Sequence, residues 1–118
     1  MKNLAPDITR QRLLIEGFYG IEVDEKVIKD YFIKLTTELG LRTYAQPIIH
    51  SPSGEGKELN QGYDAFIPLI DSGIYVGAWT NRKFFSTMIY SCKSFDVKKA
   101  IKITKEFWKI KEVAYHSF

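Results

Sequence analysis

Ser72 and Cys92 are the two side chains whose type and place in the chain could support nucleophilic or proton-transfer chemistry. Ser72 follows the acidic residue Asp71, and Cys92 comes twenty residues after the serine. A serine hydroxyl becomes a nucleophile only beside a base and an oxyanion stabiliser. The chain has no Gly-x-Ser-x-Gly motif, and its histidines, His50 and His116, are far from Ser72 in sequence. The residue types alone therefore favour a turn-forming serine and a cysteine that packs as a small hydrophobe.

The composition argues against several other kinds of site. A single cysteine excludes an internal disulfide framework and a cysteine-rich zinc site, and with two histidines we expect no metal. The net charge is +3, from 17 basic and 14 acidic residues. Six lysines recur between apolar positions of one helical segment, which is typical of a solvated face, so we expect no nucleic-acid partner. These lysines are Lys98, Lys99, Lys102, Lys105, Lys109 and Lys111.

The length and hydropathy indicate a single domain over residues 1–118. The chain is 45% hydrophobic, which is enough to bury a core. Residues 1–6 contain no apolar segment, and no run approaches 18 apolar residues. We therefore expect no membrane span and a cytoplasmic location.

Two helices and six strands are predicted from periodicity and end signals. Asp24 and Gly40 are a helix N-cap and a stop signal around an amphipathic segment, and Asp96 is the N-cap of a second helix. Strands are expected at 13–19, 43–50, 63–70, 74–79, 84–91 and 112–118, with a hairpin turn at 81–83 and a long loop at 51–62. Pro47 and Pro68 each indicate an edge or a bulge.

The order β-α-β-β-β-β-α-β predicts an α+β fold with two layers, in which two helices cover one face of a largely antiparallel sheet. The other face would stay rich in aromatic side chains, and we assign Tyr63, Tyr75, Phe85 and Tyr90 to it. An exposed apolar sheet face of this size usually marks an association surface. We therefore expect a homodimer.

Several residues around Ser72 resemble the small bacterial and archaeal S-adenosylmethionine decarboxylases. The first predicted strand ends in Phe-Tyr-Gly at 18–20, where the family has Leu-Tyr-Gly. Asp71-Ser72 corresponds to the family's Glu-Ser pair. Ile74, Trp79 and Cys92 fall at the family's spacings without a gap.

The resemblance implies specific chemistry. The Ser72 hydroxyl would attack the carbonyl carbon of Asp71, the chain would be cleaved between these residues, and Ser72 would become a pyruvoyl group. The ketone of that group serves as an electron sink when CO₂ leaves the substrate. Cys92 would protonate the product.

The chain departs from the family pattern at four positions around this site. The family histidine that assists cleavage corresponds to Gly77, and the histidine after the nucleophile corresponds to Gly73. A family serine corresponds to Asp64, which could substitute as a base. The acidic residue that would hold ribose hydroxyls corresponds to Asn81, so Trp79 and Asn81 are the candidate substrate-binding residues.

Three hypotheses follow. The first is a divergent family member that does not cleave itself and binds an S-adenosylmethionine-like ligand or pairs with an active decarboxylase. The second is an active pyruvoyl-dependent decarboxylase of S-adenosylmethionine or another amino acid, with Ser72, Cys92 and Asp64 as catalytic residues. The third is an unrelated α+β interaction domain. Whether the protein is an enzyme depends on whether Ser72 is processed.

Overall fold

The structure is a computed structural model that describes residues 1–51 and 61–118. The predicted loop at 51–62, with its Gly54–Lys57 segment, falls almost entirely outside the described residues. The described elements are, in chain order, β1 (Gln11–Phe18), α1 (Glu25–Leu39), β2 (Ile48–His50), β3 (Gly62–Leu69), β4 (Ser72–Trp79), β5 (Phe84–Ser91), α2 (Val97–Trp108) and β6 (Ala114–Ser117).

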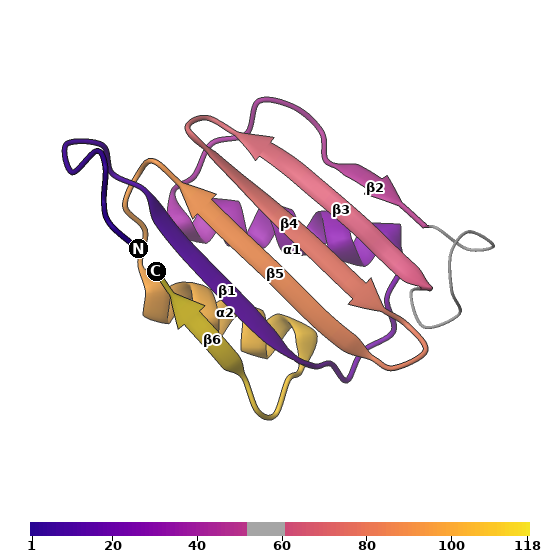
Figure 1. The fold of residues 1–118 in the computed structure, drawn as a ribbon. Helices are drawn as coiled ribbons and strands as arrows, with labels where there is room; N and C mark the ends of the chain where they lie inside the picture. The colour runs from indigo at the N-terminus through magenta and orange to yellow at the C-terminus, as the bar shows by residue number, and fades with distance from the viewer. Residues whose placement is uncertain (52–60) are drawn as a thin grey trace.

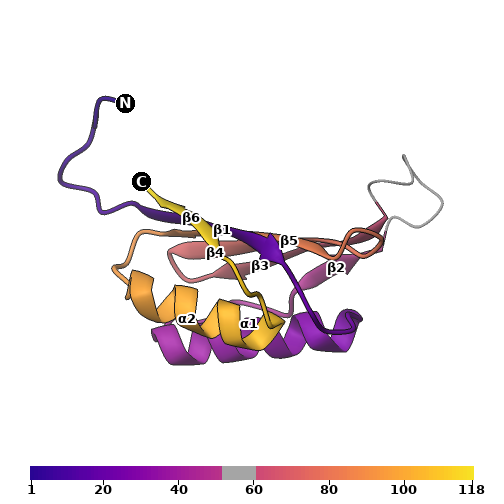
Figure 2. The same ribbon diagram turned by 90° about the horizontal axis from the view of Figure 1, so that it is seen from below.

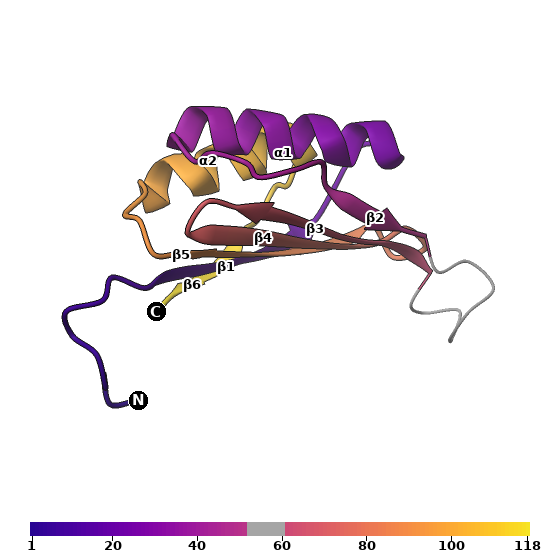
Figure 3. The ribbon, with the colours of Figure 1, turned by 90° about the horizontal axis from the view of Figure 1, so that it is seen from above.

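The strands form one sheet in the order β2-β3-β4-β5-β1-β6, and each neighbouring pair is antiparallel. Figure 1 shows this sheet in front of the two helices. Figures 2 and 3 show that α1 and α2 both lie on the same side of it. We call the uncovered side the open face. The predicted element order and the two-layer α+β fold are confirmed.

Both helices begin at the predicted N-caps, and α1 ends at the predicted Gly40. The Asp24 carboxylate accepts a hydrogen bond from the Val27 amide at 2.9 Å, and Asp96 caps α2 in the same way. Gly40 ends α1 with a left-handed φ of 68°, a conformation that glycine adopts without steric cost. Neither described helix is long and apolar enough to cross a membrane.

The core lies between the sheet and the helices. Trp108 at the end of α2 is completely buried, and its ring contacts those of Tyr31 and Phe85. A hydrogen bond of 2.8 Å joins the hydroxyl groups of Tyr31 and Thr104, which connects α1 to α2. Burying aromatic groups of this size contributes strongly to holding both helices against the sheet.

The aromatic assignment of the open face was wrong for Tyr63 and Phe85. Side chains alternate along a strand, and Phe85 is opposite Ala78 and Gly17 on the helix side, where it is fully buried. Tyr63 is also opposite Ala78 and packs against the core. Tyr75 and Tyr90 lie on the open face as predicted and remain about 40% exposed, at 39% and 42%.

The second predicted strand was too long. β2 comprises only three residues, and Thr43 forms an isolated bridge to Leu69. Pro47 stands immediately before β2, where its lack of an N–H interrupts no ladder. Pro68 lies in β3 beyond the residues that pair with β2, and its carbonyl accepts from the Tyr44 amide. Its missing donor therefore faces the side of β3 that β4 does not occupy.

Candidate functional site

Asp71 and Ser72 lie at a tight turn between two strands. β3 ends at Leu69, and β4 begins with Ser72, which is paired with Leu69 across the turn. Asp71 has a left-handed φ of 62°, which is uncommon outside glycine and better tolerated by aspartate than by most residues. The Cys92 amide donates a 2.7 Å hydrogen bond to the Asp71 carbonyl. The turn thus holds the peptide bond before Ser72 beside the end of β5.

The Ser72 hydroxyl has a defined partner in Ser91, the last residue of β5. The two side-chain oxygens are 2.7 Å apart, and Ser91 is completely buried. Ser91 donates its only hydroxyl proton to the Lys93 carbonyl at 2.6 Å and accepts from the Lys93 amide at 2.9 Å. Ser72 must therefore be the donor in the serine pair. Ser91 fixes the direction of the Ser72 proton.

A pocket of about 390 Å³ lies beside this turn on the open face. Ser72 is half-buried at its edge, and Cys92 is exposed. Most of the wall is apolar or aromatic, and Asp71 brings one carboxylate to it. The lining residues are Phe66, Asp71, Ser72, Gly73, Tyr75, Met88, Tyr90 and Cys92.

Two glycines of β4 are covered by aromatic side chains. A β-carbon at Gly73 would lie 2.9 Å from the Phe66 ring, which is closer than van der Waals contact allows. A β-carbon at Gly77 would lie 3.0 Å both from the Tyr75 hydroxyl and from the Trp79 indole. The absence of side chains at these glycines gives the three aromatic groups their space on the open face.

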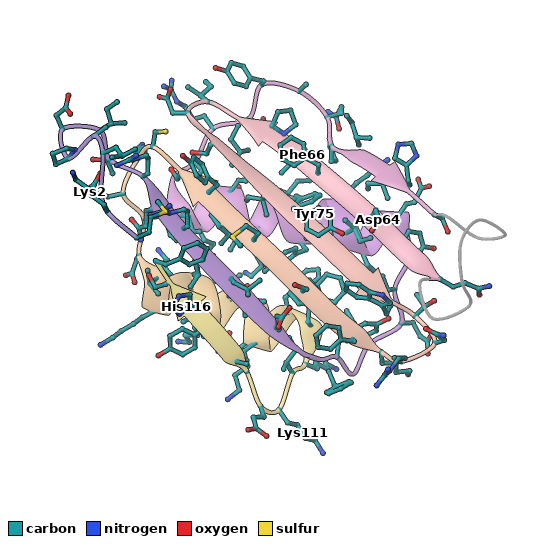
Figure 4. The ribbon with its side chains drawn as sticks, viewed as in Figure 1. Lys2, Asp64, Phe66, Tyr75, Lys111 and His116 are labelled. Atoms are coloured by element: carbon teal, nitrogen blue, oxygen red, sulfur yellow. The ribbon has the colours of Figure 1, made fainter. Side chains whose placement is uncertain are left out.

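Tyr75 and Asp64 form a hydrogen-bonded pair on adjacent strands of the open face. The Tyr75 hydroxyl donates to an Asp64 carboxylate oxygen at 3.0 Å, and the two residues face each other in Figure 4. Burial, with a further contribution from this hydrogen bond, raises the pKa of Tyr75 to about 12. Tyr75 therefore stays protonated at neutral pH and keeps donating its hydrogen bond to Asp64.

The structure brings together only some of the predicted site residues. Asp71, Ser72 and Cys92 meet at the pocket. Asp64 is paired with Gly77, which is five residues along β4 from Ser72 (77 − 72), or about 17 Å at the usual rise of a strand. Trp79 ends β4, and Asn81 is in the following turn, so both lie at the opposite end of this strand.

Sequence reasoning missed Ser91 as a partner of Ser72. The predicted turn at 81–83 does not give this pair, because counting outward from residues 80 and 84 would place Ser72 opposite Cys92. Counting outward from the observed pair Trp79 and Phe84 places Ser72 opposite Ser91. The aromatic wall formed by Phe66 and Tyr75 was also missed. Its arrangement depends on side-chain packing across strands.

Within residues 1–51 and 61–118, no group of three or more His, Cys, Asp or Glu side chains is placed to hold a metal ion.

Comparisons with known proteins agree with the fold and the sequence pattern. The family model described as S-adenosylmethionine decarboxylase matches residues 14–118. The chain is also similar to a solved structure, the adenosylmethionine decarboxylase from Aquifex aeolicus VF5, with a TM-score of 0.70 and 13% sequence identity. That match covers 94% of this chain and 89% of the other. No curated protein matches at a significant level. The chain belongs to the S-adenosylmethionine decarboxylase family.

Proposed function

We propose that this protein is a family member that keeps its chain intact and binds an S-adenosylmethionine-like ligand. It would act in the cytoplasm as a ligand-binding or regulatory protein of S-adenosylmethionine and polyamine metabolism. The observation that carries this proposal is the packing at Gly77. The place where the resemblance calls for a histidine is filled by the Tyr75 hydroxyl and the Trp79 indole.

The contacts of Ser72 also support an unbroken chain. Its hydroxyl donates to Ser91, a neutral hydroxyl that is itself held by the backbone of Lys93. Such a group orients a proton but is too weakly basic to remove it at neutral pH. Losing a positioned general base typically costs about 10²–10⁴ in rate. Cleavage at Ser72 would therefore be slow.

The pocket has the chemistry for a cationic ligand with apolar parts. Phe66, Tyr75 and Tyr90 contribute aromatic groups, and Asp71 contributes a carboxylate. Aromatic faces and carboxylates both attract cations. S-adenosylmethionine carries a sulfonium and an ammonium group beside an aromatic base, so it is suited to these walls.

An active pyruvoyl-dependent decarboxylase is the second candidate, and the left-handed conformation of Asp71 favours it. A residue held at φ 62° before Ser72 places strain at the bond that would be cleaved. A pyruvoyl group formed from Ser72 would begin the second fragment at the turn that borders the pocket and the exposed Cys92 thiol. The group would supply the electron sink, and Cys92 would supply a proton to the product.

We also propose a homodimer through the open face. Large apolar side chains on this face remain 39–60% exposed, namely Phe18, Ile48, Phe66, Tyr75 and Tyr90. Asp64 cannot contact Ser72 within one chain, because about 17 Å of strand separates their positions. If Asp64 acts as a base on Ser72, it must therefore act on the Ser72 of a second copy. Pairing with an active decarboxylase would use the same face.

The first prediction concerns chain integrity. Intact-mass spectrometry of the purified protein should give a single species with the mass of the unbroken chain, because Ser72 lacks a base. Cleavage would instead give a fragment ending at Asp71 and a second fragment from position 72 that is blocked by a pyruvoyl group. Finding that pair of fragments would replace the proposed function with the active decarboxylase.

The second prediction concerns the ligand. S-adenosylmethionine at 100 times its dissociation constant should stabilise the fold by about 2.7 kcal/mol, and the melting temperature should rise by several degrees. Phe66→Ala should remove most of this rise, because Phe66 forms a wall of the pocket. Phe18→Ala is the matched control, since Phe18 lies on the open face and does not line the pocket. No rise with millimolar S-adenosylmethionine or its decarboxylated product would argue against the ligand-binding function.

A further inference from the structure

A groove of about 720 Å³ runs between α2 and the edge strand β6, away from the Ser72 pocket. Figures 1 and 2 show α2 lying beneath this edge of the sheet, and Figure 4 labels His116 on β6. Ile101, Ile110 and Tyr115 form the apolar part of the groove. Its charged part consists of Lys98, Lys102, Lys105, Lys109 and Glu106.

The groove carries a concentrated positive charge. Four lysines and one glutamate give it +3, which equals the net charge of the whole chain. The four lysines recur along one side of α2 and its C-cap, and in the described part of the chain none of them forms an ion pair. Their charges are therefore available to a partner. A helix face that only contacts solvent would not place an apolar floor, here Ile101, Ile110 and Tyr115, beside such lysines.

The free edge of β6 offers backbone hydrogen bonds beside these lysines. Arg12 and Phe118 exchange both of their backbone hydrogen bonds, so Phe118 directs its N–H and C=O towards β1. In an antiparallel pair the direction of the backbone N–H and C=O groups alternates from residue to residue. Tyr115 and Ser117 therefore direct their N–H and C=O groups away from β1. Both residues are opposite buried positions of β1, which places their side chains on the helix side with the groove.

We propose that an extended protein segment that carries both acidic and apolar side chains on one face binds here as an added strand beside β6. Its backbone would pair with Tyr115 and Ser117. Its side chains on the helix side would contact the apolar floor and the lysines of α2. Strand addition of this kind derives affinity from main-chain hydrogen bonds and specificity from side chains on one face. A nucleic acid would use the lysines but leave the strand edge and the apolar floor unused.

The test uses a labelled peptide in which every second residue is in turn glutamate or valine, with threonine at the positions between, so that both kinds of side chain lie on one face; binding is followed by fluorescence anisotropy on the full chain. Lys102→Gln/Lys105→Gln should weaken binding about fivefold to tenfold, because each exposed charge pair contributes modestly. Lys26→Gln/Lys29→Gln on α1 is the matched control and should leave the affinity unchanged. A peptide of the same composition with its valines and glutamates in two blocks should bind more weakly.

The strand-addition geometry has its own readouts. Methylating alternate backbone nitrogens of the peptide removes donors without changing its charge, and one of the two methylation registers should abolish binding. Ser117→Pro removes an outward-facing donor of β6 and should weaken binding with no change in charge. Equal binding of both methylated peptides would overturn the proposal. So would tighter binding of a single-stranded DNA of equal charge, which would indicate a nucleic-acid surface instead.

Discussion

Light scattering of the purified protein at micromolar concentration should give about twice the mass of the 13.7 kDa chain. The open face exposes aromatic and aliphatic side chains on neighbouring strands, and contiguous apolar surface of this kind marks association surfaces. A second copy packed against this face would bury Tyr75, Tyr90 and Phe66 together. It would also enclose the pocket at Ser72.

One substitution on this face should separate the dimer. Leu14 lies on β1 between Met88 and His116, away from the pocket lining. Leu14→Glu would bury an unpaired carboxylate in each copy, at a cost of about 3–5 kcal/mol. The dissociation constant of the dimer should therefore rise more than 100-fold. Ile33→Glu is the control, because Ile33 is exposed on α1 and should tolerate the charge. A wild-type protein that is a clean monomer would contradict the homodimer.

The elements were predictable because their signals are local. Asp24 and Asp96 cap their helices through contacts within three residues, and Gly40 ends α1 through its own backbone conformation. The hairpin between β4 and β5 follows from its turn. In contrast, Tyr63 and Phe85 were assigned to the wrong face. Phe84 and Phe85 are adjacent aromatic residues, and the sequence alone does not decide which of them faces the core.

The candidate site was predicted in part. The resemblance pointed to Asp71, Ser72 and Cys92, and these three lie together because the turns around β4 and β5 bring them to one end of the sheet. The consequence of Gly77 was not predictable. It depends on how Tyr75 and Trp79 rotate over a neighbouring residue on the same strand. Periodicity assigns a side chain to a face but does not give its position on that face.

Gly77→His should fail to restore cleavage and should destabilise the protein. Its β-carbon would meet the Tyr75 hydroxyl and the Trp79 indole at 3.0 Å, so both groups must move before an imidazole can be placed. Overpacking of this kind typically costs about 1–3 kcal/mol. The melting temperature should fall by roughly 4–8 °C for each kcal/mol in a domain of this size. Gly77→Ala adds only the β-carbon, so it should lower the melting temperature by less than Gly77→His does.

Position 77 is, like Asp64, separated from Ser72 of its own chain by about 17 Å of strand, so a histidine there would act on Ser72 of the second copy, and only when space is made for it. In the triple variant Gly77→His/Tyr75→Phe/Trp79→Ala, the hydroxyl and the indole that fill the position are removed. We expect slow cleavage between Asp71 and Ser72, seen by intact mass as two fragments that accumulate over hours to days. Adding Ser72→Ala to the triple variant should abolish it, because the attacking oxygen is lost. If the triple variant is folded by circular dichroism and stays uncleaved, the packing at Gly77 is not what prevents processing. The left-handed turn at Asp71 would then lack the geometry for attack, whichever base is supplied.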